Sequence, residues 1–412
     1  MAVSTVFDLT AADKALKELY AGQVVENLVY KNNPFLALVP KFTEFGGRNY
    51  PQPVIYGNSQ GRSALFANAQ ANQTAAQVTQ FLLTRATDYS IATLDNQTML
   101  ASKTDKMAFL EAAKLVVDGA IQIITNSLAT ALFRSGTGSI GQVNASGLST
   151  GVITLMNAAD VVNFELNMTL NCSNGTTDGN AVRAAKGYVI AVDRTAGTVT
   201  VASSGLGGTA ATPASWAASE YLCVDGDLNA KIKGLTAWCP SVAPTSTTFF
   251  GVDRSVDTTR LGGVRYDGSA QDLPEALVDA SMLVGREGGT PDYCFMNFQS
   301  YAALEKALGA KVQYIDLKGP ADVAFKGIRI HGANTEIKVV PDRSCPAKTA
   351  FLLQLDTWKL RSLGDAPQIL RYGDGLEMLR VYNADSSELR VAYYAQLGCA
   401  APGWNANVTL SA

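Results

Sequence analysis

Charged residues are scarce in this 412-residue chain: they make up 17% of the sequence, whereas a typical soluble domain has roughly 25%. Apolar residues make up 47%, which excludes an intrinsically disordered chain. Lys and Arg total 33 against 36 Asp and Glu, and a net charge of −3 excludes the basic footprint of a sequence-reading nucleic-acid-binding protein. We expect a folded protein with a largely uncharged surface, either because neighbouring subunits cover it or because the chain is simply β-rich and weakly charged.

The residues that build metal sites and disulfide frameworks are few and dispersed. The six cysteines form no C-x-x-C pair, which fits reduced thiols in a cytoplasm and excludes the usual zinc spacing. They are Cys172, Cys223, Cys239, Cys294, Cys345 and Cys399. Since the chain has a single histidine, His331, it has no histidine cluster. The sequence predicts no metal and no cofactor, with the cysteines acting as small apolar fillers.

Signals for a membrane or for export are lacking as well. The amino terminus, MAVSTVFDLT, has neither a basic segment nor an apolar segment of a secretory signal. No uninterrupted apolar run approaches the 18 residues typical of a membrane span. We therefore expect no membrane partner and a protein that is made in a cytoplasm.

Two motifs resemble ligand-binding loops but have the wrong context. The G-x-G-x-x-G at Gly136–Gly141 follows an expected helix and precedes a β-rich stretch, whereas a dinucleotide fold needs a strand before it and a helix after it. Asp225–Asn229 begins like a calcium loop, but Ala230 stands where glycine is needed and Thr236 where glutamate is needed. A charged turn is the better interpretation.

Catalysis of the serine-hydrolase type would depend on His331. This residue lies in the expected strand GIRIHG, and no G-x-S-x-G elbow accompanies it. We predict that the protein is not an enzyme, and a β-rich hydrolase with His331 in a triad is the remote alternative.

The chain divides into five stretches of different character. Apolar residues at helical spacing predict helices over residues 10–31 and 104–134. Between them, residues 45–87 have two strand-like edges around a middle rich in Gly, Ser, Ala, Asn and Gln, which indicates a long β-hairpin arm. Residues 138–236 are rich in turn and β-forming residues and predict a small β-barrel or sandwich. From residue 237 the pattern is mixed α and β.

Within these stretches we expect several individual elements. The expected strands are 53–56, 80–86, 160–166, 187–192, 198–202, 292–297, 328–331, 336–340, 349–354, 377–382 and 389–394, and the further helices are 273–286 and 300–308.

Three segments carry a resemblance to a known family. They are ALKELYAGQVVENLVYKNNPFLALVPK with the following GGRNYPQPV, the helix TDKMAFLEAAKLVVDGAIQIITNSLATALF, and the carboxyl-terminal TWKLRSLGDAPQILRYGDGLEMLRVYNADSSELRVAYYAQLGCAAPG. Their order resembles the major capsid protein of tailed double-stranded DNA bacteriophages, with the Hong Kong 97-like fold. The likeness covers residues 1–135 and about 237–412, and the β segment between looks like the insertion domain of some members.

The resemblance implies an α+β fold with a long spine helix, a mixed α/β axial domain and an extended β-hairpin loop, plus an inserted small β-barrel or sandwich domain. The implied domains are an amino-terminal arm at 1–44, the extended loop at 45–86, a peripheral domain at 87–137 and 370–412, the inserted domain at 138–236 and the axial domain at 237–369.

The implied function is structural: pentamers and hexamers of the chain form an icosahedral virion capsid around packaged DNA, assembled in the host bacterial cytoplasm. The arm starts within ten residues of Met1, so either a separate scaffolding protein acts or a cleaved segment is missing from this sequence. A portal, possible decoration proteins and non-specific contact with double-stranded DNA complete the implied partners. An encapsulin-like nanocompartment shell is the alternative, which the inserted domain and the long loop disfavour.

The hairpin arm holds the candidate inter-subunit contacts, because a hairpin of about 40 residues cannot bury its own apolar side chains and needs cover from a neighbour. The candidates are Arg48, Val54, Ile55, Arg62, Leu65, Phe66, Phe81, Leu82 and Arg85. In family members that cross-link, an extended-loop lysine attacks an asparagine of a neighbour. This sequence has no lysine between Lys41 and Lys103, so we expect no such cross-link.

Overall fold

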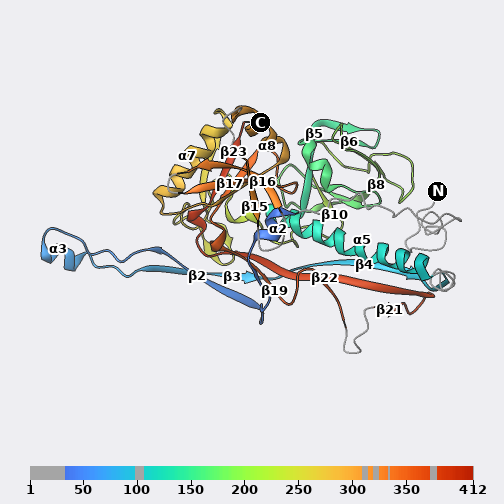
Figure 1. The fold of residues 1–412 in the computed structure, drawn as a ribbon, viewed down its shortest axis with the longest axis horizontal. Coiled ribbons are helices and arrows are strands. Elements are labelled where there is room, and N and C mark those ends of the chain that lie inside the picture. The colour runs from blue at the N-terminus through green and yellow to red at the C-terminus, as the bar shows by residue number, and fades with distance from the viewer. Residues whose placement is uncertain are drawn as a thin grey trace.

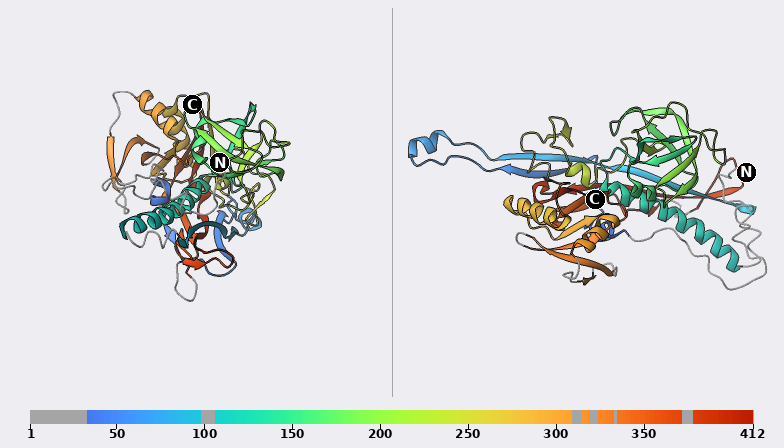
Figure 2. Two further views of the ribbon diagram at one scale, coloured as in Figure 1. Left: turned by 90° about the vertical axis from the view of Figure 1, so that its right-hand side faces the viewer. Right: turned by 90° about the horizontal axis from the view of Figure 1, so that it is seen from above.

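The computed structural model describes residues 33–97, 106–308, 314–318, 324–332, 335–371 and 378–411. It is an elongated molecule in which two compact parts lie above a long β-ribbon and a thin hairpin extends from one end (Figures 1 and 2). The helix expected over residues 10–31 lies outside the described residues.

One compact part is built on a seven-stranded mixed sheet in the order β13-β23-β18-β14-β17-β16-β15. The pairs β13–β23 and β14–β17 are parallel and the other pairs are antiparallel. The strands are β13 Val264–Gly268, β14 Tyr293–Met296, β15 Tyr314–Lys318, β16 Ala324–His331, β17 Glu336–Pro341, β18 Thr349–Leu353 and β23 Ala406–Leu410. The fold class is therefore mixed α+β, as the sequence predicts.

Helix α7 (Leu273–Arg286) packs on this sheet, and α8 (Phe298–Leu308) packs beside it. The buried residues of α7 recur at helical spacing: Leu273, Ala276, Leu277, Ala280, Ser281 and Val284. The helix approaches β13 so closely that a Cβ on Gly268 would lie 2.5 Å from the Cβ of Ala276. Both helices confirm the sequence prediction, since their amphipathic pattern is local.

The β-ribbon belongs to a second sheet, in which β22 (Ser386–Cys399) is central. It pairs with β4 (Ala86–Asp95) in an antiparallel register from Ala395↔Ala86 to Ser386↔Asp95. The shorter strands are β1 Lys41–Phe42, β19 Trp358–Ser362, β20 Gln368–Ile369 and β21 Met378–Arg380. The strand expected over 389–394 is only part of β22, and no expected strand corresponds to β4 or β23.

Helix α5 (Lys106–Phe133) lies along the ribbon and confirms the long helix expected over 104–134 (Figure 1). Ala120, Ile124, Leu128 and Leu132 are buried at intervals of four residues. By length and composition alone, Val116–Phe133 is apolar enough to cross a membrane, and 44% of this window is buried inside the molecule. Packing of one face into the core accounts for that apolar character.

The large core next to α5 contains Phe35, Phe133, Trp238 and Trp358, all at most 1% exposed. Short elements bring these side chains together: α2 Pro34–Leu38, α6 Leu235–Trp238, β11 Thr248–Phe249, β12 Val252–Asp253, η4 Leu355–Thr357 and η5 Pro402–Trp404.

The second compact part is a closed β-barrel in the order β10-β5-β6-β9-β8-β7, between α5 and α6 in the chain. Its strands are β5 Ser139–Ser149, β6 Val152–Leu155, β7 Thr169–Ser173, β8 Val182–Asp193, β9 Thr198–Ala202 and β10 Tyr221–Val224. The strand expected over 160–166 is wrong, because Ala158–Asn163 is a 3-10 helix, η2. Arg134 forms an ion pair with Asp160 in this 3-10 helix, and Val161 and Phe164 pack in the barrel core. These side chains do not alternate between two faces as they would in a strand.

The hairpin consists of β2 (Asn49–Gly57) and β3 (Gln77–Thr84), with α3 (Phe66–Ala71) at its tip. The antiparallel register runs from Asn49↔Thr84 to Ile55↔Val78. This confirms the predicted β-hairpin. Strand β2 is longer than the expected 53–56, and β3 begins and ends earlier than the expected 80–86.

Candidate assembly surface

The base of the hairpin is anchored in the chain's own core. The Phe81 side chain is fully buried, with its ring centroid 5.0 Å from that of Trp238 and 6.2 Å from that of Phe249. Alternation along β3 buries Leu83 as well. The backbone N–H of Leu82 donates to the Phe250 carbonyl at 2.9 Å, so the strand is fixed by both packing and hydrogen bonding.

Polar contacts fix the base from three sides. Arg361 Nη2 donates to Gln52 Oε1 at 3.2 Å, and both residues are buried. Arg85 Nη1 donates to the Phe45 carbonyl at 2.7 Å and its guanidinium lies over the Phe45 ring. On the other edge, Arg260 Nη1 donates to the Tyr56 carbonyl at 2.7 Å. The direction in which the hairpin leaves the body is therefore set by the chain itself.

These contacts correct part of the sequence analysis. Val54 and Phe81 were expected at inter-subunit contacts, but they pack into their own chain, and half-buried Arg85 binds Phe45. The assumption that the hairpin buries none of its apolar residues is wrong at its base, because one face of each strand lies against the body there.

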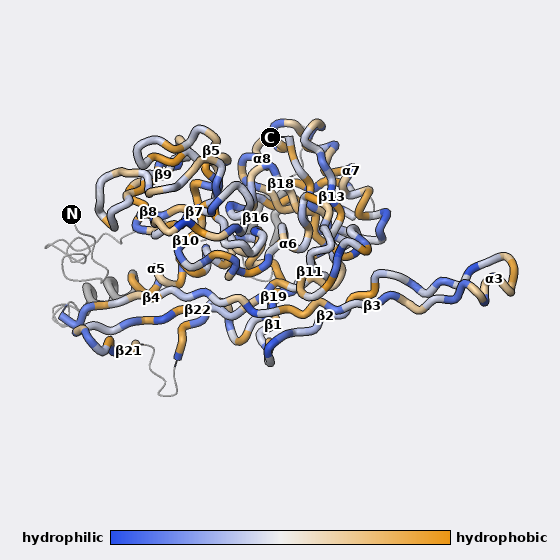
Figure 3. Tube along the Cα trace, turned by 180° about the vertical axis from the view of Figure 1, so that it is seen from behind, coloured by the Kyte–Doolittle hydropathy of each residue, from blue (hydrophilic) through white to orange (hydrophobic). Residues whose placement is uncertain are grey.

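Beyond the base the hairpin has no core of its own. No residue from 58 to 78 is buried, and α3 buries none of its six residues. We define its tip as residues 59–77, where the tube in Figure 3 is partly orange and partly blue around α3, because a few apolar residues stand among Ser, Asn and Gln. The exposed large apolar residues of the hairpin are Ile55 (67%), Leu65 (65%), Phe66 (84%), Val78 (59%) and Leu82 (38%). Arg48 and Arg62 are also exposed.

An open groove of about 430 Å³ lies where the hairpin leaves the body. The hairpin contributes Pro53 to Asn58, and the segment after β22 contributes Ala400, Ala401, Gly403 and Trp404. Arg260 and Glu287 supply the charged side chains. Sequence reasoning missed this groove, because its walls come from segments that are hundreds of residues apart and share no pattern.

The barrel is joined to the body through two chain segments that run side by side. Asn229 N donates to Thr137 O at 2.9 Å, and Gly234 N donates to Arg134 O at 3.0 Å. Gly138 has φ +83°, and a Cβ there would lie 2.3 Å from the Asp227 carbonyl oxygen. Gly138 of the G-x-G-x-x-G motif thus allows a close backbone approach just before β5, whereas Gly141 makes room for the Phe164 ring.

A buried ionic cluster fastens this junction to the ribbon and to α5. Lys231 Nζ lies 2.5 Å from Asp88 Oδ2 on β4 and 3.0 Å from Asp227 Oδ2, and it donates to Ser127 Oγ on α5 at 3.0 Å. The Lys231 side chain is 9% exposed. Asp225, the other carboxylate of the supposed calcium loop, binds Lys186 and Asn171. The described residues contain no group of three or more potential metal ligands.

The stability of the subunit should depend on pH through Asp227. Burial raises the pKa of this carboxyl from 3.8 to about 6, against the attraction of Lys231. The folded state therefore binds more protons than the unfolded state between these values, so the free energy of unfolding falls as pH rises from 4 to 6. Replacing Asp227 by Asn removes this ionisation cost, about 3 kcal/mol at pH 7.5, and flattens the pH dependence.

Urea midpoints of the wild type and Asp227→Asn at pH 4.5, 6.0 and 7.5 measure this effect. The exposed Asp365→Asn serves as a control that should follow the wild type. A stability difference between Asp227→Asn and the wild type that is the same at all three pH values would contradict the assignment.

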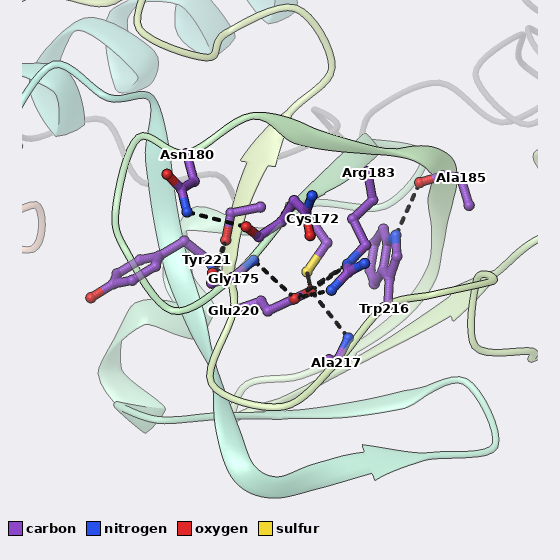
Figure 4. Close-up of polar contacts among 11 residues, drawn as sticks. Cys172, Gly175, Asn180, Arg183, Ala185, Trp216, Ala217, Glu220 and Tyr221 are labelled. Carbon is purple, nitrogen blue, oxygen red and sulfur yellow. Dashed lines mark hydrogen bonds and ion pairs between the residues drawn. The ribbon is translucent and has the colours of Figure 1, made fainter.

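A second buried carboxylate holds the barrel together (Figure 4). Glu220 is 2% exposed and accepts hydrogen bonds from Arg183 Nε at 3.0 Å, Cys172 Sγ at 3.3 Å, and the Gly175 and Ala217 N–H groups at 3.1 Å each. Burial alone would raise the pKa of Glu220, but these hydrogen bonds outweigh it and lower the pKa. Because both carboxylate oxygens accept hydrogen bonds from the chain's own groups, Glu220 fits a structural role within the barrel.

The one residue considered for catalysis is His331. His331 is exposed at the end of β16 and lies opposite Glu336 in the register with β17. All six cysteines are buried, and burial raises the pKa of each thiol, so none is an activated nucleophile.

No protein-family model and no curated protein matches the sequence. Among solved structures, the chain is similar to a chain of the cyanophage A-1(L) capsid asymmetric unit, with a TM-score of 0.55 and 13% identity over 96% of this chain and 98% of that one. Mycobacterium phage Ogopogo (TM-score 0.44, 9% identity, 98% and 99% covered) and the SrpI encapsulin complex of Synechococcus elongatus (0.45, 9%, 99% and 96%) are also similar. The cyanophage match spans nearly all of both chains and shows a shared fold.

Proposed function

We propose that the chain is a structural protein, the major capsid protein of a tailed double-stranded DNA bacteriophage with the Hong Kong 97-like fold. The observation that carries this proposal is the end-to-end structural match with a chain of the cyanophage A-1(L) capsid. A hairpin that leaves the body with an exposed apolar tip supports it, because such a tip needs cover from another subunit.

The domain roles follow from this proposal. Residues 1–44 form the amino-terminal arm, 45–86 the extended loop, 87–137 with 370–412 the peripheral domain, and 237–369 the axial domain. Residues 138–236 are the inserted domain, and the barrel with its paired connections supports this assignment. The exposed hairpin residues Ile55, Leu65, Phe66 and Leu82, with Arg48 and Arg62, remain the proposed inter-subunit contacts.

The partners are other copies of the chain in pentamers and hexamers, a scaffolding protein and a portal. Packaged DNA contacts the shell non-specifically, and the weakly acidic net charge of −3 suits a container that must release its DNA. The proposed location is the virion, after assembly in the host bacterial cytoplasm, and the protein has no enzymatic role.

Electron microscopy and light scattering of the expressed protein test the proposal. Closed shells are expected, or aberrant polymers and capsomers when no scaffold is present. Particles from infected cells should contain double-stranded DNA. Particles filled with a protein cargo and free of nucleic acid would favour an encapsulin-like shell, and a stable monomer at all concentrations and salt conditions would contradict both.

The mature shell should not be cross-linked through the hairpin. Residues 42–102 contain no lysine, and an arginine guanidinium is a poor nucleophile. A denaturing gel of boiled mature particles under reducing conditions should show one band near 43.5 kDa. Persistent bands of pentamer and hexamer size would refute this prediction.

A further inference from the structure

The hairpin has almost no charged residues. From residue 49 to residue 84 the sequence has one charged residue, Arg62. It is exposed in the tip, three and four residues before the exposed Leu65 and Phe66, and it forms no ion pair with any described carboxylate. Exposed charge on a hairpin serves solubility when it is spread along both strands. A single cation beside two large apolar side chains indicates a specific contact instead.

The groove at the hairpin base has the complementary chemistry. Ile55 and Trp404 line it with apolar surface and are 67% and 40% exposed. Its carboxylate is Glu287, whose only described ion pair is a loose one of 3.5 Å to the exposed Arg286. The groove arginine, Arg260, is already engaged by the Tyr56 carbonyl and by Asp257. Glu287 is therefore the charge that remains for an incoming cation.

We propose that the tip of one subunit docks in the groove of a second copy, with Leu65 and Phe66 against Ile55 and Trp404 and with Arg62 paired to Glu287. This inference rests on the proposed function and names the surface that covers the tip. Figure 1 shows α3 at the end of the hairpin farthest from the body, whereas the groove residues lie where the hairpin leaves the body, so the contact joins different copies. Because tip and groove are different surfaces, the contact is head-to-tail, and repeating it closes a ring when the rotation between copies permits.

Engineered disulfides test the contact. Ala67 lies next to Phe66 in the tip and Ala400 lines the groove, and both are exposed. The six native cysteines are buried and do not interfere. Assembled Ala67→Cys/Ala400→Cys protein should give, after mild oxidation, a ladder of multiples of 43.5 kDa on a non-reducing gel. Mixing the two single variants should give dimers only.

A matched control pairs Ala67→Cys with Ala145→Cys, an exposed alanine on the barrel, and should give no ladder. If electron microscopy shows assembled particles and the tip–groove pair gives no more cross-linking than this control, the inference is overturned while the proposed function stands. If the wild type does not assemble under any condition, both fail.

A charge swap tests the ion pair independently. Arg62→Glu and Glu287→Arg should each raise the protein concentration needed for assembly by roughly fivefold or more, since each places like charges at the contact. The double variant Arg62→Glu/Glu287→Arg should restore assembly. Additive defects in the double variant would show that these side chains do not meet.

Discussion

Phe66→Asp is expected to abolish assembly and to leave the subunit folded and soluble. The Phe66 side chain is 84% exposed on a short helix that buries nothing, so the substitution removes no packing within the chain. At the proposed inter-subunit contact, however, it replaces a ring worth about 1.5–3 kcal/mol of burial by a charge that must lose its water. Since every subunit of the proposed shell makes this contact, we expect no assembly up to at least roughly tenfold the concentration at which the wild type assembles.

Light scattering against protein concentration, with circular dichroism on the same samples, separates the two effects. Leu166→Asp on the barrel provides a control at a site of similar size and 59% exposure, and it should assemble as the wild type does. Phe81→Asp, by contrast, should unfold the hairpin base and lose solubility, because Phe81 packs on Trp238. Loss of solubility in Phe66→Asp as well would place the tip in a core and refute the proposed contact.

Lys231→Met should destabilise the subunit by roughly 3–5 kcal/mol at pH 7.5, the usual cost of leaving a buried charge without its partner. Lys231 is the cation that separates Asp88 from Asp227, and without it two carboxylates of low exposure face each other. Part of the loss should be recovered at pH 5. Asp227 already has a pKa raised to about 6, and removing Lys231 raises it further, so the carboxyl is neutral there.

Urea unfolding at pH 7.5 and pH 5.0 measures both parts of this prediction. Lys186→Met is the matched control, because Lys186 also pairs with an aspartate at 2.5 Å but is 45% exposed. Solvent screens such an exposed pair, so its loss should have little effect on stability. Equal losses in the free energy of unfolding from the two substitutions would show that Lys231 does not stabilise the junction more than an exposed ion pair does.

Helices α5 and α7 could be predicted because their burial pattern repeats every three or four residues within one segment. The hairpin could be recognised from composition, but composition does not predict which of its side chains face the body. Val54 and Phe81 are buried by Trp238 and its neighbours, which follow more than 150 residues later in the chain. Strand alternation gives two faces and does not say which one is covered.

The functional surfaces depend even more on distant residues. Lys231 and Asp88 are 143 positions apart, and nothing in either local sequence marks them as partners. The groove likewise joins Ile55 to Glu287 and Trp404. Arg62 is the exception: its isolation in a stretch without other charges is visible in the sequence, although its proposed partner is not.

The paired connections of the barrel make it replaceable. The chain enters and leaves through neighbouring strands that are hydrogen-bonded at Thr137–Asn229 and Arg134–Gly234, so the body spans no gap at this point. A foreign domain with adjacent termini, joined after Gly138 and before Asp227, would keep both this stem and Lys231. The exposed turn at 194–196, which joins β8 to β9, is suitable for inserting a short epitope. In the proposed shell, every copy of the chain would carry the insert, which gives a regular array.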